Sequence, residues 1–595
     1  MNEKPKSIWK KSWTGLGAVF ILVVSAAVAV FLVAFIYALT NWERPVADTL
    51  TTAALIGFVL AACCLFAGCF VLSLRWLFWT HWRRGLFGLA CFATLIALAY
   101  AEEDWRGWHA WNQFKHEWEA KGEKFDWQSV VPPPVPDDQN FAMAPIWVES
   151  IKAMLGPERA RQWKYPSDGR TNYSDWMPII WHNNDGSDSQ PNGDWTKGTI
   201  TDLKQWQIYY RSPAATNQKS PTVTNDFPIT PQPQTPAEDV LLALSKFGPA
   251  IEELRQASRL PYSRFPLGYD SENPSIILLP HLSLLKRSAL VLELRSIAEL
   301  QNGQSEKALD DVKLMLRLTD AVRTEPFLIS QLVRIAMLQI TLQPIYEGLA
   351  EHKWSDAQLA ELDAELAKLD FLADYGFSMR GEMIFGISET EYLHRSRNFQ
   401  ALDYSENGSH DNSASHLGFR LAPASFFYQN ELTIAQMHER WTLPMVDPEK
   451  RVVSPELVKR NNDAASKVLN HPSPCNILAR MIFPAFSKSV TKYVRAQSSV
   501  DLARVAIALE RYRLAHGGYP DSLDALAPQF MKKVPHDVIG GGPLHYRRTS
   551  DGQFVLYSVG WNERDDGGVV VLQKGSTPAV DINQGDWVWR YPQKE

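Results

Sequence analysis

The sequence predicts a membrane-anchored multidomain protein with three N-terminal transmembrane helices, a mainly α-helical extracytoplasmic domain and a C-terminal α+β domain containing a small antiparallel sheet. Long uncharged runs within the first hundred residues predict the anchor. Helical spacing of apolar residues in the centre and alternating segments near the end predict the other two parts. The length of 595 residues leaves room for several folding units.

The composition excludes several classes of protein. Apolar residues make up 45% of the chain and charged residues 21%, which is close to a globular average and excludes wholesale disorder. The formal net charge is −6, so no excess of positive charge is present to bind a phosphate backbone. We therefore expect no nucleic-acid partner.

The anchor consists of three apolar runs, at about residues 16–40, 51–74 and 85–101. A helix needs about 20 residues to cross the hydrocarbon core, so the first two runs suffice and the third is at the lower limit. A cleaved signal peptide is the alternative for the first run. That run is longer than the about 7–15 apolar residues of a signal peptide, and no A-x-A site follows it.

The distribution of basic residues predicts the orientation. Four lysines precede the first run and three arginines lie between the second and third, whereas acidic residues follow the third. Basic flanks face the cytoplasm. The prediction is a multi-pass protein of the bacterial inner membrane, with a cytoplasmic N-terminus and with residues 102–595 outside the cytoplasm. If the third run does not span, the large part lies on the opposite side.

Four domains are predicted along the chain: 1–104 with the transmembrane helices, 105–235 with a continuing helix and Pro-rich and polar loops, 236–479 mainly helical, and 480–595 α+β. Thr235-Pro-Ala-Glu is a helix start with a capping box, and Ser355 begins another helix through Leu369. Within 236–479, Leu279–Gln301 and Ser305–Val322 predict an αα-hairpin. No clean second copy occurs at 34 residues, so a plain bundle is preferred to tetratricopeptide repeats.

One further central helix is predicted at Phe327–Leu349, where Pro344 is expected to kink or end it.

The last hundred residues follow a distinct order. Ala496–Leu514 is an amphipathic helix that ends at a Gly-Gly-Tyr-Pro turn, and a short helical turn follows at 522–526. Leu544–Arg548 and Gln553–Val559 alternate as strands do, and Asp551-Gly552 between them is a hairpin signal. A Trp-rich strand is expected at the end.

This order resembles the soluble domain of the major pseudopilin of type II secretion and its type IV pilin relatives. The segments that carry the resemblance are ALERYRLAHGGYPDSLDAL, LHYRR, FVLYSVGWNERDDGG and VDINQGDWVW, and it covers roughly residues 480–595. The stretch before the helix has no processing motif and only a short apolar piece, interrupted by Pro484. We therefore expect a fused domain and not a polymerising pilin.

The resemblance also implies a structural calcium ion. By position in the family pattern, its ligands would be Asn562, Asp565, Asp566 and Asp581, and calcium prefers such oxygen donors on a loop. The family usually has Asp where this chain has Asn562, and Glu563-Arg564 look inserted. An Asp/Gly turn without metal is the alternative.

No motif in the sequence identifies a catalytic or cofactor-binding residue. His281 lies among apolar residues, as a core histidine does. Arg380, Glu382, Glu389 and Glu391 could form a carboxylate set on one helix for acid–base chemistry, but a solvated or salt-bridged helix face is the preferred interpretation. The predicted function is a structural or interaction protein of the envelope, in contact with the bilayer and envelope proteins and linked to secretion or pilus-like machinery. The alternative is an extracytoplasmic hydrolase-like enzyme whose site is assembled from distant residues. A deep polar pocket would favour the enzyme, and a broad apolar surface patch the interaction protein.

Overall fold

The computed structural model divides the chain into two compact units, Met1–Glu103 and Asp104–Glu595. The predicted membrane runs 16–40 and 51–74 lie outside the described residues. The structure describes residue 83 and the ranges 86–162, 191–212, 227–397, 420–471, 473–481, 488–575 and 579–592.

The third predicted run is helical and continues beyond the predicted span. A helix runs from Leu86 to Glu119, and none of its most apolar 18-residue window is buried. Among the described residues, two other helices are also long and apolar enough to cross a membrane, Pro274–Gln301 and Leu328–Ala350. Their windows are 44% and 67% buried, so we interpret them as core helices of the second unit.

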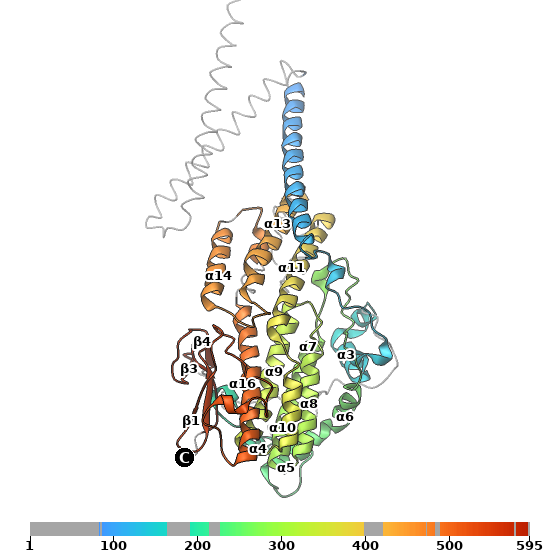
Figure 1. The fold of residues 1–595 in the computed structure, drawn as a ribbon. Coiled ribbons are helices and arrows are strands. Elements are labelled where there is room, and N and C mark those ends of the chain that lie inside the picture. Colours follow the sequence, from blue (N-terminus) through green and yellow to red (C-terminus); the bar gives the residue numbers. More distant parts are fainter. Residues whose placement is uncertain are drawn as a thin grey trace, which may run out of the picture. The chain divides into compact units, whose positions relative to one another are not determined.

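The second unit is mostly helical, with its strands gathered near the C-terminus (Figure 1). The α-helices are α3 (Pro145–Gln162), α4 (Leu203–Arg211), α5 (Pro236–Leu244), α6 (Gly248–Ala257), α7 (His281–Gln301), α8 (Ser305–Asp320), α9 (Leu328–Ala350), α10 (Asp356–Leu366), α11 (Phe371–Ser396), α13 (Ala424–Met437), α14 (Pro455–Leu469) and α16 (Ser489–His516). The strands are β1 (His545–Arg548), β2 (Phe554–Ser558), β3 (Val570–Leu572), β4 (Val580–Gly585) and β5 (Trp587–Arg590).

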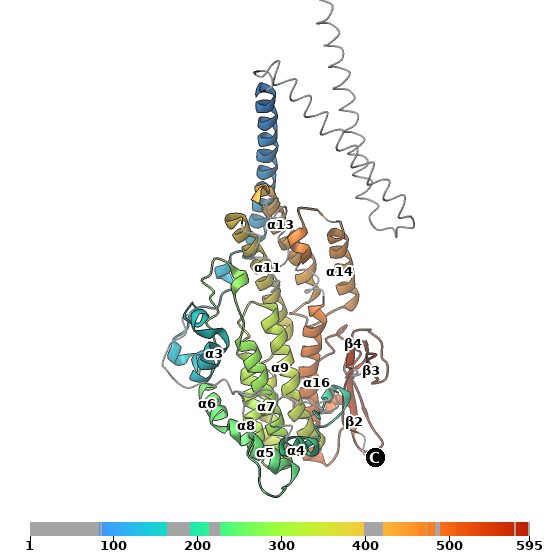
Figure 2. The same ribbon diagram turned by 180° about the vertical axis from the view of Figure 1, so that it is seen from behind.

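The long helices α7, α8, α9, α11 and α16 run side by side, as both ribbon views show (Figures 1 and 2). Helices α7 and α8 form the predicted αα-hairpin, joined by a turn in which Gly303 has a positive φ of 71°. Helix α16 contacts α9, α10 and α11 on one side and β2 and β5 on the other.

Local signals set several of these boundaries as predicted. The Thr235 side chain accepts from the Glu238 N–H while the Glu238 carboxylate accepts from the Thr235 N–H, which completes a capping box. At the start of α10, the Ser355 hydroxyl accepts from the Gln358 N–H and the Gln358 side-chain oxygen accepts from the Ser355 N–H, which forms a second capping box. Pro344 does not end its helix, because α9 continues through it to Ala350.

The core consists of two large apolar clusters. One lies around α3, α5, α6, α7 and the inner face of α8. The other joins α9, α10, α11 and α16 to the C-terminal sheet and includes Leu338 and Val505, both fully buried. The second cluster therefore extends across residue 480, where a domain boundary was predicted. The division into four domains stays a prediction.

The C-terminal strands pair as the sequence indicates. Strands β1 and β2 are antiparallel, with Arg548 opposite Phe554, and β5 pairs with the other edge of β2. The Trp-rich strand is β5, and a second hairpin, β3–β4, was not predicted. Helix α16 begins at Ser489, seven residues before the predicted start, and ends at Gly517, whose φ of 81° few other residues adopt.

Candidate functional site

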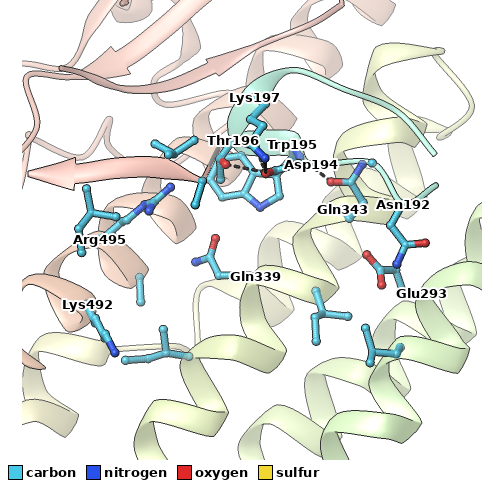
Figure 3. A pocket seen from close by; sticks show the side chains of 18 residues that line it. Asn192, Asp194, Trp195, Thr196, Lys197, Glu293, Gln339, Gln343, Lys492 and Arg495 are labelled. Carbon is cyan, nitrogen blue, oxygen red and sulfur yellow. Dashed lines mark hydrogen bonds and ion pairs between the residues drawn. The ribbon is translucent and has the colours of Figure 1, made fainter. Parts of the chain in front are cut away.

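A pocket of about 700 Å³ lies between segments that are far apart in the sequence. Its walls come from α7, α9 and α16, from residues 192–197, and from residues 579–582 at the start of β4. Such a volume is within the range of about 300–1,000 Å³ that is typical of small-molecule sites. Figure 3 shows Lys492 and Arg495 on one side, Asn192 and Glu293 on the other, and Gln339 between them.

The segment that closes one end of the pocket is held by α9. The Gln343 amide accepts from the Trp195 N–H at 2.6 Å and donates to the Thr199 carbonyl at 3.1 Å. One turn later, the Glu347 carboxylate accepts from the N–H and the hydroxyl of Thr201 at 2.9 and 2.7 Å. Side chains four residues apart share a helix face, so α9 fixes this segment at two successive points.

Gly193 permits the close approach of this segment to α9. A Cβ atom at this position would lie 2.2 Å from Nε2 of Gln343 and 2.8 Å from the Thr199 carbonyl oxygen. Any larger residue would therefore displace the segment that forms the pocket wall.

Trp195 provides an aromatic wall. Its ring lies 5.2 Å from that of Trp589 on β5, and Trp589 in turn meets Tyr346 edge to face at 5.5 Å. Trp195 also begins a short 3-10 helix, for which the Asp194 carboxylate accepts from the Thr196 N–H. Asp194 forms an ion pair with Lys197 at 3.1 Å, so its charge is compensated within the segment.

Glu293 is the buried acid of the pocket, which Asp194 also lines. It is 7% exposed, and no described residue donates a hydrogen bond to its carboxyl group. Burial, and then the negative charges of Glu347 and Asp194, raise the pKa of Glu293 well above its usual value. Burial therefore makes ionisation of this carboxyl group less favourable than that of an exposed glutamate.

Glu347 behaves similarly, although it has partners. Burial raises its pKa to about 7, against the lowering effect of its hydrogen bonds from Gln343 and Thr201.

Two cations face the acid from α16. Lys492 and Arg495 are three residues apart and both line the pocket. Burial lowers the pKa of Arg495, while Asp194 acts in the opposite direction. Arg495 forms no side-chain hydrogen bond or ion pair with any described residue. By contrast, Arg334 in the core pairs with Asp374, and Arg255 lies 2.7 Å from Asp311.

The four predicted calcium ligands all take part in hydrogen bonds in the C-terminal region. Asn562 donates to the Asp566 carboxylate at 2.8 Å, while Asp565 accepts from the Tyr557 hydroxyl at 2.9 Å and from a backbone N–H. Asp581 accepts from the Asn583 N–H, on β4. Within the described ranges, no group of three or more His, Cys, Asp or Glu residues is arranged to hold a metal ion. The calcium site at these four residues stays a prediction.

A different carboxylate organises this loop. Asp586 is 1% exposed and accepts from the backbone N–H groups of Asp566, Gly568 and Val569 at 3.3, 2.7 and 3.3 Å. It stands directly before Trp587, five residues after the position chosen from the sequence. Its three amide donors stabilise the loop without requiring a cation.

The other residues singled out from the sequence have structural roles. His281 is fully buried, 2.8 Å from Glu325 and stacked on Phe265, which confirms a core histidine. Arg380 forms a two-point ion pair with Glu123. Glu382 was expected on a solvated or salt-bridged face, but it is half-buried and accepts a hydrogen bond from the first N–H of α9, at Leu328.

The pocket residues were missed by sequence reasoning. The available signal was weak: Glu293 is one acid within an otherwise apolar stretch, between Leu292 and Leu294. Lys492 and Arg495 precede the helix as it was predicted. No local pattern indicates that these residues face one another, since only the packing of α7 and α16 against α9 brings them together.

Comparisons with protein-family models, with curated proteins and with solved structures find no match. The function is therefore inferred from the pocket, the apolar helix and the sequence patterns.

Proposed function

We propose that this chain is a membrane-anchored structural and interaction protein of the bacterial envelope. Its N-terminal helices would hold it in the inner membrane, and its second unit would work outside the cytoplasm by binding other molecules. The specific form of the proposal links it to secretion or pilus-like machinery, on the resemblance of residues 480–595.

The observation that carries the proposal is the helix Leu86–Glu119. None of its most apolar window is buried by the rest of the chain, and Phe87 and Phe92 are 72% and 64% exposed. Apolar side chains in such number require lipid or protein to cover them. An adjoining unit with its own extensive core is what an anchored interaction protein needs.

Orientation is tested by labelling engineered cysteines with a membrane-impermeant maleimide. We would replace Cys475 by Ser and introduce S550C, in the exposed turn between β1 and β2. The matched variant is S7C, in the basic N-terminal segment. We expect S550C to react on intact spheroplasts and S7C to react only after lysis, whereas the reverse pattern would contradict the predicted orientation.

The interaction role is tested by a cross-linked pull-down of the full-length protein from its native membranes. Recovery of secretion or pilus components supports the specific proposal. Recovery of other envelope proteins supports an interaction protein with a borrowed C-terminal domain. If no partner is recovered, the interaction role is contradicted.

A second candidate function is an extracytoplasmic hydrolase-like enzyme. The observation that favours it is the presence of two unlike carboxyl groups at one pocket, the buried Glu293, whose pKa is raised, and Asp194, which forms an ion pair with Lys197. An acid and a base that differ in this way can transfer protons to and from a substrate. Turnover of an ester or glycoside library that is lost in both E293Q and D194N would favour this function.

A further inference from the structure

The pocket places unpaired groups of opposite chemical character across one space. Arg495 is a partly buried guanidinium that forms no direct ion pair or side-chain hydrogen bond with a described residue, although Asp194 acts on it at longer range, and Glu293 is a buried carboxyl group without a described hydrogen-bond donor. Leaving a charged or polar group both desolvated and unpaired costs several kcal/mol in general. A bound ligand that satisfies both groups would recover this cost.

The local charge balance favours an anion at the α16 side. Asp194 and Lys197 compensate each other at 3.1 Å, so the remaining cations are Lys492 and Arg495. Glu293 lies on the opposite wall of the pocket and forms no ion pair with Lys492 or Arg495. Arg provides two parallel N–H groups that match the spacing of carboxylate and phosphate oxygens.

The remaining walls limit the size and character of the ligand. Leu290, Ile335, Ile340 and Ala496 form apolar lining, and Trp195 provides a flat face. A volume of about 700 Å³ suits a small organic molecule and is too small for a folded partner.

We propose that this pocket binds a small organic oxyanion, a carboxylate or a phosphate ester, with its anionic group at Arg495 and Lys492 and an amine or hydroxyl group donating to Glu293. Arg495 would bind the anion in two-point fashion and Lys492 would add a nearby charge. Gln339, which lies between the two ends, has an amide that can bond either part of the ligand (Figure 3). This inference goes beyond the proposed envelope role and does not depend on the orientation in the membrane.

Binding is measured by isothermal titration of the full-length protein in detergent micelles. The probes are O-phosphoethanolamine and 4-aminobutyrate, which carry both groups, and inorganic phosphate, acetate and ethanolamine, which carry one. We expect at least one two-group probe to bind at least tenfold more tightly than either of its single-group counterparts. Whether O-phosphoethanolamine or 4-aminobutyrate is preferred distinguishes a phosphate from a carboxylate ligand.

Variants assign the two ends of the ligand. R495Q is expected to weaken binding of the two-group probe at least tenfold. E293L is expected to make the two-group probe bind no more tightly than phosphate or acetate alone, and to leave the binding of phosphate or acetate unchanged. R511Q is the matched control, because it removes the same charge from α16 about 24 Å along the helix. The Arg511 side chain pairs there with Asp356.

Two results would overturn the inference. One is that neither two-group probe binds the wild-type protein more tightly than its single-group counterparts. The other is that R495Q binds as tightly as R511Q, which would mean that the guanidinium only extends toward solvent. A circular dichroism spectrum of each variant that matches the wild type separates loss of binding from loss of folding. A failure here leaves the labelling and pull-down results unaffected, so the two proposals fail separately.

Discussion

Glu510 is the centre of a charged network where α16 meets the C-terminal sheet, and we expect its removal to destabilise the protein in a pH-dependent way. Its buried carboxylate accepts from Arg513 at 2.7 and 2.8 Å, from the Tyr519 hydroxyl at 2.9 Å, and lies 2.9 Å from Nδ1 of His352. Burial alone would raise the pKa of Glu510, but the hydrogen bonds and charges of Arg513 and His352 outweigh it. The resulting pKa is about 2, against an ordinary value of 4.5.

The size of the effect follows from this difference in pKa. A lowering from 4.5 to about 2 corresponds to roughly 3 kcal/mol, at about 1.4 kcal/mol for each tenfold change in proton affinity. Because His352 is 31% exposed, solvent screening reduces this figure, and we expect E510Q to lose about 2 kcal/mol at pH 7. A carboxylate whose pKa is lower in the folded state stabilises the fold above its unfolded pKa. That stabilisation is lost as the pH falls through the folded pKa.

The assay is urea unfolding of the full-length protein in micelles at several pH values from 7 to 3, followed by tryptophan fluorescence. The gap in stability between wild type and E510Q should be constant above about pH 5 and shrink steadily below pH 4.5. The matched control is E361Q, which breaks an exposed ion pair with Lys313 and should cost less than about 0.5 kcal/mol. A gap that does not change with pH would refute the electrostatic explanation and leave only a packing effect.

Three further predictions concern the core and the C-terminal loop. G348A should destabilise the protein by about 1–3 kcal/mol in urea unfolding, because the new Cβ would lie 2.1 Å from Nε1 of Trp354, whereas G248A, with no atom within 4 Å, should change little. D374N should lower the free energy of unfolding by about 3–5 kcal/mol, because it leaves the fully buried Arg334 guanidinium without its main counter-ion. A D374N variant as stable as the wild type would contradict this prediction. If the C-terminal loop binds calcium, calcium at 100 times its Kd should raise the free energy of unfolding by about 2.7 kcal/mol relative to a sample with chelator. Equal melting midpoints with chelator and with millimolar calcium would contradict the calcium prediction.

Local features of the fold were predictable because their causes lie within a few residues. The Thr235 capping box, the helix start at Ser355, the αα-hairpin of α7 and α8, and the Asp551-Gly552 hairpin were each predicted from the sequence and are present. In each case one side chain or one glycine decides the backbone conformation.

Features that depend on tertiary packing were not predictable in the same way. Pro344 was expected to kink or end its helix; it does not end it, because α9 continues to Ala350 and Tyr346 beyond the proline is fully buried. Packing on several sides can hold a helix together where one backbone hydrogen bond is missing. The expectation of a solvated or salt-bridged face at Glu382 was wrong for a related reason, because its half-buried carboxyl group accepts a hydrogen bond at the start of another helix.

The candidate site shows the same limit. Asp581 was chosen as a loop ligand by its place in a family pattern, but the carboxylate that binds the loop amides is Asp586. Glu293 and Arg495 are about 200 residues apart in the chain. The residues next to each one in the sequence give no indication that the two lie near each other. They lie close together because α7 and α16 both pack against α9. Such packing cannot be predicted from the local pattern of a single sequence.

The shared core of α9 and α16 has a consequence for biosynthesis. The face of α9 that includes Leu338 and Leu342 is buried in the same cluster as Val494 and Val505 of α16. Roughly 140 residues separate the end of α9 from the start of α16. At a synthesis rate of about 5–20 residues per second, that face waits roughly 7–28 s before its covering helix leaves the ribosome. A chain that crosses a membrane during this interval does so with an incomplete core, so we expect a holding chaperone to accompany the nascent protein until its last hundred residues arrive.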